Sequence, residues 1–131
     1  MLTIENVRSA QRRVDQYIRK TPLVSEDAIN LIANAEVFLK LENLQVTHAY
    51  KVRGSASALP LLTQKQKQHG IVTASTGNHG FGFSYIAGKL GIDAVVVVPT
   101  KALQKKVDAI QKYGAKIIKY GDTIFEASQK A

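Results

Sequence analysis

The chain has 131 residues, of which 45% are hydrophobic, with three prolines, no cysteine and a formal net charge of +8. This length and composition predict a folded domain, and the lack of cysteine excludes disulfides, zinc–thiolate sites and cysteine nucleophiles. No stretch reads as a signal peptide or membrane span, and the cationic residues are scattered without interleaved aromatics, so we expect a cytoplasmic protein that binds neither membranes nor, by preference, nucleic acid.

The first half of the chain predicts short, separate elements. Apolar residues at helical spacing predict a helix over about 4–19, with Thr3 as N-cap and Thr21-Pro22 as its end. Alternating character over 36–42 predicts a strand, which is followed by a loop over 43–50 and a helix starting near Lys51. Pro60 should kink or end that helix, and the pair Thr63 and Gln66 predicts a capped helix reaching about residue 68.

From Gly70 onward, strands and helices alternate regularly. Strands are expected over 71–74, 94–98 and 116–120, with amphipathic helices near 78–90 and 103–110 and a last helix capped by Asp122. The middle strand is apolar throughout, as in a strand covered on both faces. The alternation predicts an α/β fold, a three-layer parallel sheet with flanking helices and right-handed crossovers.

A candidate ligand loop, Ser75-Thr76-Gly77-Asn78-His79-Gly80, follows the first of these strands and begins a helix. Ligands of parallel sheets bind at this edge, where amides at a helix N-terminus can hold a carboxylate or phosphate. The alternative is an ordinary turn in which Asn78 caps the helix, and the residues alone leave both interpretations open. The glycines at 77, 80 and 82 do not match a dinucleotide fingerprint, and Gly82 to Lys89 is one residue too long for a P-loop.

Lys51 lies at a loop-to-helix junction. On position alone it is an ordinary surface lysine, because an amine becomes a nucleophile only where its neutral form is favoured. Its sequence context indicates more, because several segments together resemble fold-type II pyridoxal-phosphate enzymes of the threonine dehydratase and serine racemase group, and specifically their N-terminal part. The segments are residues 39–45 (LKLENLQ), 50–54 (YKVRG) and 75–80, with Thr21-Pro22-Leu23, Lys106-Val107-Asp108-Ala109 and Tyr113-Gly114-Ala115 in the same order.

The resemblance implies pyridoxal 5'-phosphate as the cofactor and assigns roles to matching residues, none of them a metal ligand. Lys51 would form the Schiff base and then move the Cα proton of a small amino-acid substrate. Tyr50 would flank the cofactor ring, and Asn78 would hydrogen-bond its 3-hydroxyl oxygen. The loop that receives the substrate carboxylate would comprise Ser75, Thr76, Gly77 and His79. For Arg53, an ion pair that supports the helix is at least as good an interpretation as a functional role.

Departures from the family pattern narrow the expected chemistry. Ala49 replaces a serine found in many relatives, and Thr76 replaces the serine of racemizing relatives, which favours dehydration of a hydroxy-amino acid to a keto acid and ammonia. No glycine-rich cluster is available to hold the cofactor phosphate. We therefore expect residues 1–50 to belong to an incomplete large domain and 51–131 to a truncated small α/β domain. The chain alone should be inactive or weak; the alternative is a non-catalytic α/β protein that binds or self-associates as a homo-oligomer.

Overall fold

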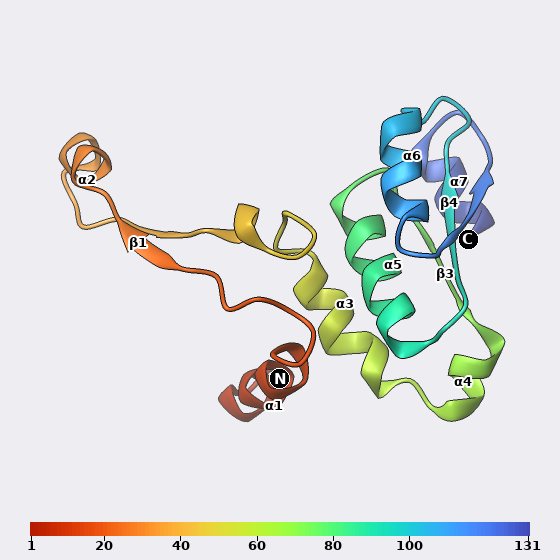
Figure 1. The fold of residues 1–131 in the computed structure, drawn as a ribbon, viewed down its shortest axis with the longest axis horizontal. Coiled ribbons are helices and arrows are strands. Elements are labelled where there is room, and N and C mark those ends of the chain that lie inside the picture. The colour runs from red at the N-terminus through yellow and green to blue at the C-terminus, as the bar shows by residue number, and fades with distance from the viewer.

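The computed structural model covers residues 1–131 and has two parts of different character, an N-terminal helix with an extended arm and a C-terminal α/β unit (Figure 1). The arm and its surroundings contain α1, β1, α2, β2, a 3-10 turn and α3. Their bounds are Ile4–Val14, Leu23–Ser25, Asp27–Ala33, Phe38–Lys40, Glu42–Leu44 and Val52–Ala58, in that order.

The C-terminal unit is built on three parallel strands in the order β3-β4-β5, which confirms the expected parallel sheet. Val96 of β4 pairs with Thr73 of β3 on one side and with Ile117 of β5 on the other. A 3-10 turn at Leu59–Leu61 and helix α4 (Gln64–His69) lead into the sheet, whose elements are β3 (Ile71–Ala74), α5 (Asn78–Leu90), β4 (Ala94–Val98), α6 (Gln104–Gln111), β5 (Lys116–Lys119) and α7 (Ile124–Lys130).

Helices cover both faces of this sheet, so the unit has the three layers expected from the sequence (Figure 1). Val96 and Val98 of β4 are fully buried in the main core with Ile86 of α5 and Ile110 of α6. Val97 points to the opposite face, where α7 packs on β3 and β4. Both faces of β4 are therefore covered by helices, which explains why this strand is an uninterrupted run of apolar residues.

The arm differs from this unit because it has almost no core. Strands β1 and β2 pair antiparallel, with Val24 opposite Leu39, and α2 forms the tip between them. None of the residues 22–41 is buried, and Figure 1 shows the arm reaching away from the helices around α3. The sequence predicted only the strand at 36–42, which is in fact limited to Phe38–Lys40, and it missed β1 and α2.

Several helix ends differ from the expectation. Helix α1 stops at Val14 rather than near residue 19. Thr123, not Asp122, caps α7, because its hydroxyl accepts from the Glu126 amide at 3.2 Å while Asp122 accepts from the Thr100 hydroxyl. The strand expected over 116–120 ends at Lys119. The capping box of α4 is confirmed, and so is the end of α3 at Pro60, because α3 stops at Ala58 and Pro60 lies in a 3-10 turn. Helices α4 and α5 end at Gly70 and Gly91, as expected, and both glycines have a positive φ.

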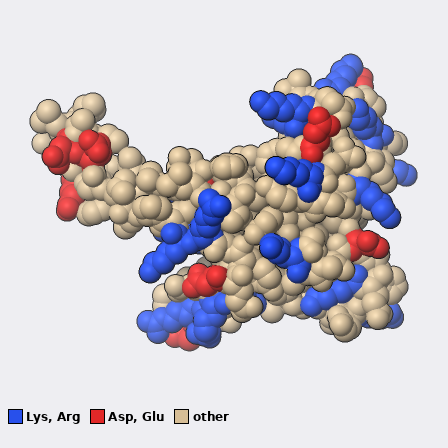
Figure 2. Space-filling view, in the orientation of Figure 1, with Lys and Arg blue, Asp and Glu red and all other residues tan.

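The face of the molecule drawn in Figure 2 shows no single strongly basic stripe. Figure 2 shows Lys and Arg side chains distributed over the end of α1, the middle of the molecule and the region of α6, whereas the arm tip displays only acidic side chains. No helix is long and apolar enough to cross a membrane.

Candidate functional site

The start of α3 is held unusually close to α5, and this contact positions Lys51. A Cβ atom added to Gly82 of α5 would lie 2.7 Å from the Val52 Cα and 3.3 Å from the Lys51 carbonyl carbon. Only glycine permits such an approach between two backbones. Because Gly82 follows Asn78 by one helical turn, the Lys51 backbone lies beside the first turns of α5.

The Lys51 side chain itself is exposed and makes no hydrogen bond or ion pair within the chain. The backbone around it is anchored instead, because Ala49 is buried and Val52 is completely buried. Tyr50 between them is 62% exposed. The Lys51 amine is therefore accessible to solvent, while the backbone that carries it is held in place by buried neighbours.

The loop between β3 and α5 is stabilised by Ser75. Its buried hydroxyl oxygen accepts hydrogen bonds from the amides of Gly80, at 2.9 Å, and Gly77, at 3.2 Å. Helix α5 begins at Asn78, and the side chain of Asn78 makes no capping bond. The interpretation of Asn78 as an ordinary helix cap is therefore wrong, and its exposed side-chain amide is free to contact a ligand.

Three backbone amides of the loop have no acceptor within the chain, those of Thr76, Asn78 and His79. Amides at the start of a helix carry a partial positive charge and favour an anion. The His79 ring is turned to β3, with its Nε2 atom 3.1 Å from the Thr73 hydroxyl. Of the side chains predicted to receive a carboxylate, Ser75 and His79 are thus engaged internally. The Ser75 amide also donates to the Val97 carbonyl at 3.2 Å, so of these two residues only His79 offers a free amide.

A hollow of about 520 Å³ adjoins this loop on the side of α6. It is lined by Gly77, Asn78, Phe81, Lys105, Lys106 and Ala109. Thr76 and Lys106 also line a smaller neighbouring hollow, where Lys101 pairs with Asp122 at 3.1 Å. Lysines beside unpaired amides add positive potential, which favours a carboxylate-bearing ligand. No group of three or more His, Asp or Glu side chains is placed to hold a metal ion.

Arg53 supports the base of α3 through an ion pair, as one of the two interpretations proposed. Its Nε and NH2 atoms donate to the two carboxylate oxygens of Glu42, at 2.9 and 2.7 Å. The Thr21 hydroxyl also donates to Glu42. The hydrogen bond from Arg53 is the main cause that lowers the pKa of Glu42 from 4.5 to about 2, against the opposing effect of burial. This cluster joins the arm to the helix that follows Lys51.

The pH dependence of stability should report this ion pair. Because the pKa of Glu42 is lower in the folded state, its contribution is fully present above about pH 4.5 and is lost as the pH falls towards 2. We expect about 2 kcal/mol of unfolding free energy to disappear in this window, a value already reduced for solvent screening. Urea unfolding between pH 2 and 6, about the range of this titration, measures it. Glu42→Gln should flatten the profile and Glu36→Gln, on the exposed arm, should not; equal profiles for all three proteins would contradict the assignment.

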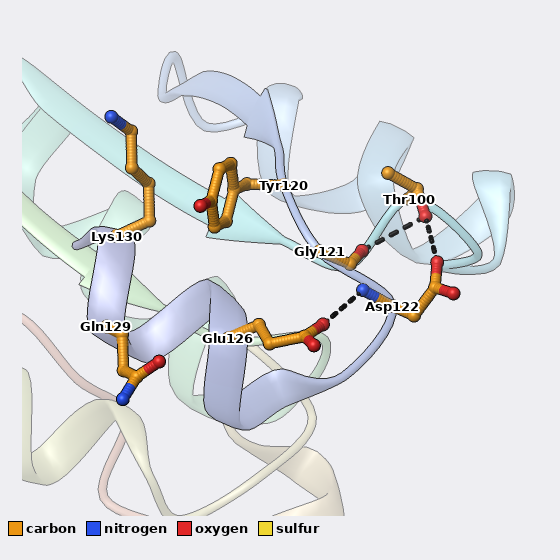
Figure 3. A pocket seen from close by; sticks show the side chains of 7 residues that line it. All are labelled: Thr100, Tyr120, Gly121, Asp122, Glu126, Gln129 and Lys130. Atoms are coloured by element: carbon orange, nitrogen blue, oxygen red, sulfur yellow. Dashed lines mark hydrogen bonds between the residues drawn. The ribbon is translucent and has the colours of Figure 1, made fainter.

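A second hollow, of about 510 Å³, lies beyond the ends of β4 and β5 (Figure 3). Its polar groups bond mainly to one another: the Thr100 hydroxyl donates to the Gly121 carbonyl at 3.0 Å, and Glu126 accepts from the Asp122 amide at 2.6 Å. Figure 3 shows these bonds closing the turn before α7. None of the candidate site residues lines this hollow, and the hydrogen bonds around it stabilise the turn from which α7 begins.

Comparison with known proteins agrees with this arrangement. Residues 14–131 match the sequence model of the family described as pyridoxal-phosphate dependent enzyme. This chain belongs to that family. A catabolic L-threonine dehydratase of Staphylococcus aureus is 39% identical over 127 residues, which are 96% of this chain and 37% of the dehydratase. The resemblance inferred from the sequence motifs is therefore confirmed.

Solved structures of family members share the fold. The crystal structure of serine racemase from Dictyostelium discoideum superposes with a TM-score of 0.90 at 36% identity, over 96% of this chain and 41% of that one. Threonine deaminase isoform 2 of Solanum lycopersicum gives a TM-score of 0.91 at 26% identity, over 97% of this chain and 35% of that one. The chain thus spans well under half the length of the family members that it matches.

Sequence reasoning missed two residues that support the site. Gly82 could have been found, because glycines inside an otherwise apolar helix weaken it unless a close approach requires them. Gln45 could not: its side chain is completely buried and bonds to the backbone of Arg19, which is 26 positions away in the sequence.

Proposed function

We propose that this chain supplies the lysine and the substrate-carboxylate loop of a pyridoxal-phosphate-dependent lyase, which eliminates water from a hydroxy-amino acid to give a keto acid and ammonia. In this proposal residues 51–131 form the small domain and residues 1–50 contribute to a large domain. The observation that carries it is the backbone contact between Lys51–Val52 and Gly82, which holds Lys51 beside the first turns of α5.

The residues present suit the aldehyde and ring end of pyridoxal phosphate. Lys51 offers an unpaired primary amine, and Asn78 offers a side-chain amide without an internal partner. When bound, this cofactor supplies an electron sink that stabilises negative charge at the substrate Cα. Tyr50, exposed next to Lys51, is suited to flank the cofactor ring. The family to which this chain belongs is described as pyridoxal-phosphate dependent, which supports this choice of cofactor.

Binding of the substrate carboxylate is assigned to the amides of Thr76, Asn78 and His79, supported by the charge of Lys106. A carboxylate fixed there presents the substrate Cα towards the side of α5 on which Lys51 starts α3. The Lys51 amine would then take the Cα proton and deliver it to the departing hydroxyl of the neighbouring carbon, which leaves as water. Thr76, one carbon larger than serine, crowds the second face of the substrate and favours elimination over racemization.

Weak activity of the isolated chain follows from what surrounds Lys51. Its amine is exposed, so water competes with the cofactor and substrate for contact with it. The chain also covers only 37% of the threonine dehydratase, and none of its loops is a glycine-rich phosphate cradle. We therefore expect a reversible adduct with the cofactor and little or no turnover.

Reductive trapping tests the assignment of the lysine. Purified chain is incubated with pyridoxal phosphate, reduced with borohydride, digested and analysed by mass spectrometry. We expect the phosphopyridoxyl mass on the peptide that contains Lys51, and at least about tenfold less modification of any other lysine, because an anchored amine beside the ring-binding residues reacts in preference to freely solvated ones.

Matched variants separate a site from random labelling. Lys51→Ala should abolish the preferred adduct, whereas Lys65→Ala, on exposed α4, should leave it unchanged. Asn78→Ala should weaken the apparent affinity without changing which lysine is modified. Uniform labelling of the exposed lysines, or a preferred adduct that survives Lys51→Ala, would refute the proposal.

A further inference from the structure

A hollow of about 560 Å³ lies where α1, the base of the arm and α3 meet. One wall is a single face of α1 and of the turn that follows it, and its residues recur at helical spacing. They are Val7, Gln11, Asp15 and Ile18. Neither Lys51 nor any residue of the loop over 75–80 lines this hollow. It is therefore a concave surface separate from the candidate site described above.

The rest of this hollow is lined only by cationic side chains. They are Arg19 and Lys20 from the segment that leaves α1, Lys40 from β2 and Arg53 from α3. Two carboxylates accompany them, Asp15 in the α1 wall and Glu42, which pairs with Arg53. In the view of Figure 2, basic side chains project from beneath the base of the arm. Four positive and two negative side chains leave a net charge of +2 around one concave surface, which attracts an anion.

Arg53 and Lys40 are held in place and still have hydrogen-bond donors to offer. The Nε and Nη2 atoms of Arg53 donate to Glu42, whereas its Nη1 atom makes no hydrogen bond within the chain. The Lys40 ammonium donates to the Thr21 carbonyl at 2.6 Å, which uses one of its three N–H groups. A donor whose position is already fixed loses little freedom when a ligand binds, so these two side chains form a preorganised half of the hollow.

Arg19 and Lys20 supply the other half of the hollow. The Arg19 backbone is fixed by the buried Gln45, whose Oε1 atom accepts from the Arg19 amide at 2.8 Å. The Arg19 guanidinium makes one long hydrogen bond, of 3.4 Å to the Leu44 carbonyl, and the Lys20 side chain makes none. Neither side chain forms an ion pair, although Asp15 lines the same hollow. Their charges are therefore not neutralised by contacts within the chain.

The arrangement of these charges selects the kind of ligand. Lysines scattered on a convex surface indicate no ligand, but here the cations surround a concavity to which Val7 and the half-buried Ile18 add apolar surface. The net charge of +2 matches a dianion. Because the donors come in two groups, residues 19–20 and the pair Lys40 and Arg53, a ligand with two separate carboxylates uses both groups, whereas a compact phosphate contacts only one.

We propose that this hollow, which we name the basic hollow, binds a small dicarboxylate. Arg53 and Lys40 receive one carboxylate through charge-assisted hydrogen bonds, and Arg19 with Lys20 receives the other. The carbon chain between the two carboxylates lies against the apolar part of the α1 wall. A bound dicarboxylate links the end of α1 to β2 and α3 and thereby stabilises the folded chain. Binding in the basic hollow does not require the chemistry proposed at Lys51.

Titration of the full 131-residue chain with glutarate tests the proposal. Glutarate is compared at constant ionic strength with valerate, in which a methyl group replaces one carboxylate, and with inorganic phosphate, a compact dianion. Calorimetry should show one site that binds glutarate about tenfold or more tighter than either, because only glutarate reaches both groups of cations. The amide NMR signals that shift on binding should be those of Gln11, Asp15, Lys20 and Lys40, not those of residues 75–80.

Charge variants at the basic hollow should change the affinity in opposite directions. Lys20→Glu should weaken glutarate binding by about tenfold or more, because a donor becomes a repelling carboxylate. Asp15→Asn, which removes the carboxylate of the α1 wall and keeps its shape, should tighten binding by about threefold. Both side chains are exposed and neither forms an ion pair, so the fold should persist, which circular dichroism checks. Lys65→Glu, exposed on α4, makes the same change in net charge as Lys20→Glu and should leave the affinity within about twofold.

Three outcomes overturn the proposal. The first is that glutarate does not bind, or that valerate or phosphate binds as tightly. The second is that Lys65→Glu weakens binding as much as Lys20→Glu does, which shows attraction to the net charge alone. The third is that the shifted signals belong to residues 75–80, in which case the loop after β3 takes the dicarboxylate.

Two controls keep the result decisive. If Lys20→Glu does not fold, Asp15→Asn decides alone, and an affinity for glutarate that is unchanged or weaker in this variant overturns the proposal. Trapping with pyridoxal phosphate is measured on the same samples, and Lys20→Glu should keep the preferred adduct at Lys51. A failure of the proposed chemistry is thereby distinguished from a failure of binding in the basic hollow.

Discussion

Replacing Gly82 with alanine is expected to destabilise the chain by about 3 kcal/mol, since the added methyl group has no space. The new Cβ would lie 2.7 Å from the Val52 Cα and 2.9 Å from the Val52 nitrogen. Both atoms belong to the backbone, so no rotation of a side chain can relieve the clash. The two helices must separate, and the completely buried side chains of Val52 and Ala56 on α3 lose contacts as they do.

The same substitution should disturb the site, since Lys51 precedes Val52 directly. We expect the apparent affinity for pyridoxal phosphate to fall, with trapping still specific for Lys51. Gly54→Ala is the matched control: Gly54 lies on the exposed side of α3 with nothing within 4 Å of an added Cβ, so alanine should stabilise the helix by up to about 1 kcal/mol. Urea unfolding of both variants measures the contrast, and equal midpoints would show that α3 and α5 do not need this close approach.

The C-terminal unit could be predicted closely because its signals are local. Apolar runs bounded by glycine and proline define β3 and β4, and the structure places both strands at the expected residues. Gly91 ends α5 with a φ of 65°, a conformation that favours glycine over side-chain-bearing residues. The loop from Ser75 to Gly80 followed from the rule that parallel strands direct ligands to their carboxyl ends.

The arm could not be predicted because its apolar residues pack into no core within this chain. Leu31 and Ile32 of α2 are exposed, so they form no periodic buried face with other residues. Strand β1 has only three residues and follows Pro22, which resembles a turn more than a strand. Apolar residues that pack on nothing in this chain give no buried periodicity to read, and the missed elements are the ones that carry such residues.

The candidate site shows the same difference between residues with a local sequence signal and residues without one. Lys51, Asn78 and the loop were predicted as site residues from motifs that are contiguous in sequence, and the structure brings the start of α3 beside the start of α5 at Gly82. The groups that hold them in place are long-range contacts. Arg53 reaches Glu42 across 11 residues and Gln45 reaches Arg19 across 26, distances at which no local pattern exists. Residues that position a site through long-range contacts are therefore the hardest to predict from a single sequence.

Replacing Gln45 with methionine is expected to cost about 3 kcal/mol or more, because it removes three hydrogen bonds and leaves their partners unsatisfied. The Gln45 side chain is completely buried. Its Oε1 atom accepts from the amides of Arg19 at 2.8 Å and Val46 at 2.9 Å, and its Nε2 atom donates to the Arg19 carbonyl at 2.9 Å. The side chain thus pairs with residue 19 as a neighbouring strand would, and it joins the segment after α1 to the loop before Lys51.

Methionine nearly preserves the volume and the apolar contacts of glutamine. The loss of unfolding free energy therefore measures the three hydrogen bonds of Gln45 rather than a cavity. Gln68→Met, at an exposed position on α4, is the matched control and should change the unfolding free energy by less than about 0.5 kcal/mol. Hydrogen exchange at the Arg19 amide should accelerate in Gln45→Met alone, and Lys51 trapping should weaken because the loop before it is released. If Gln45→Met and Gln68→Met unfold at the same urea concentration, water replaces the three hydrogen bonds of Gln45 with no loss of stability. The position of Lys51 then depends on the contact at Gly82 and on the ion pair of Arg53.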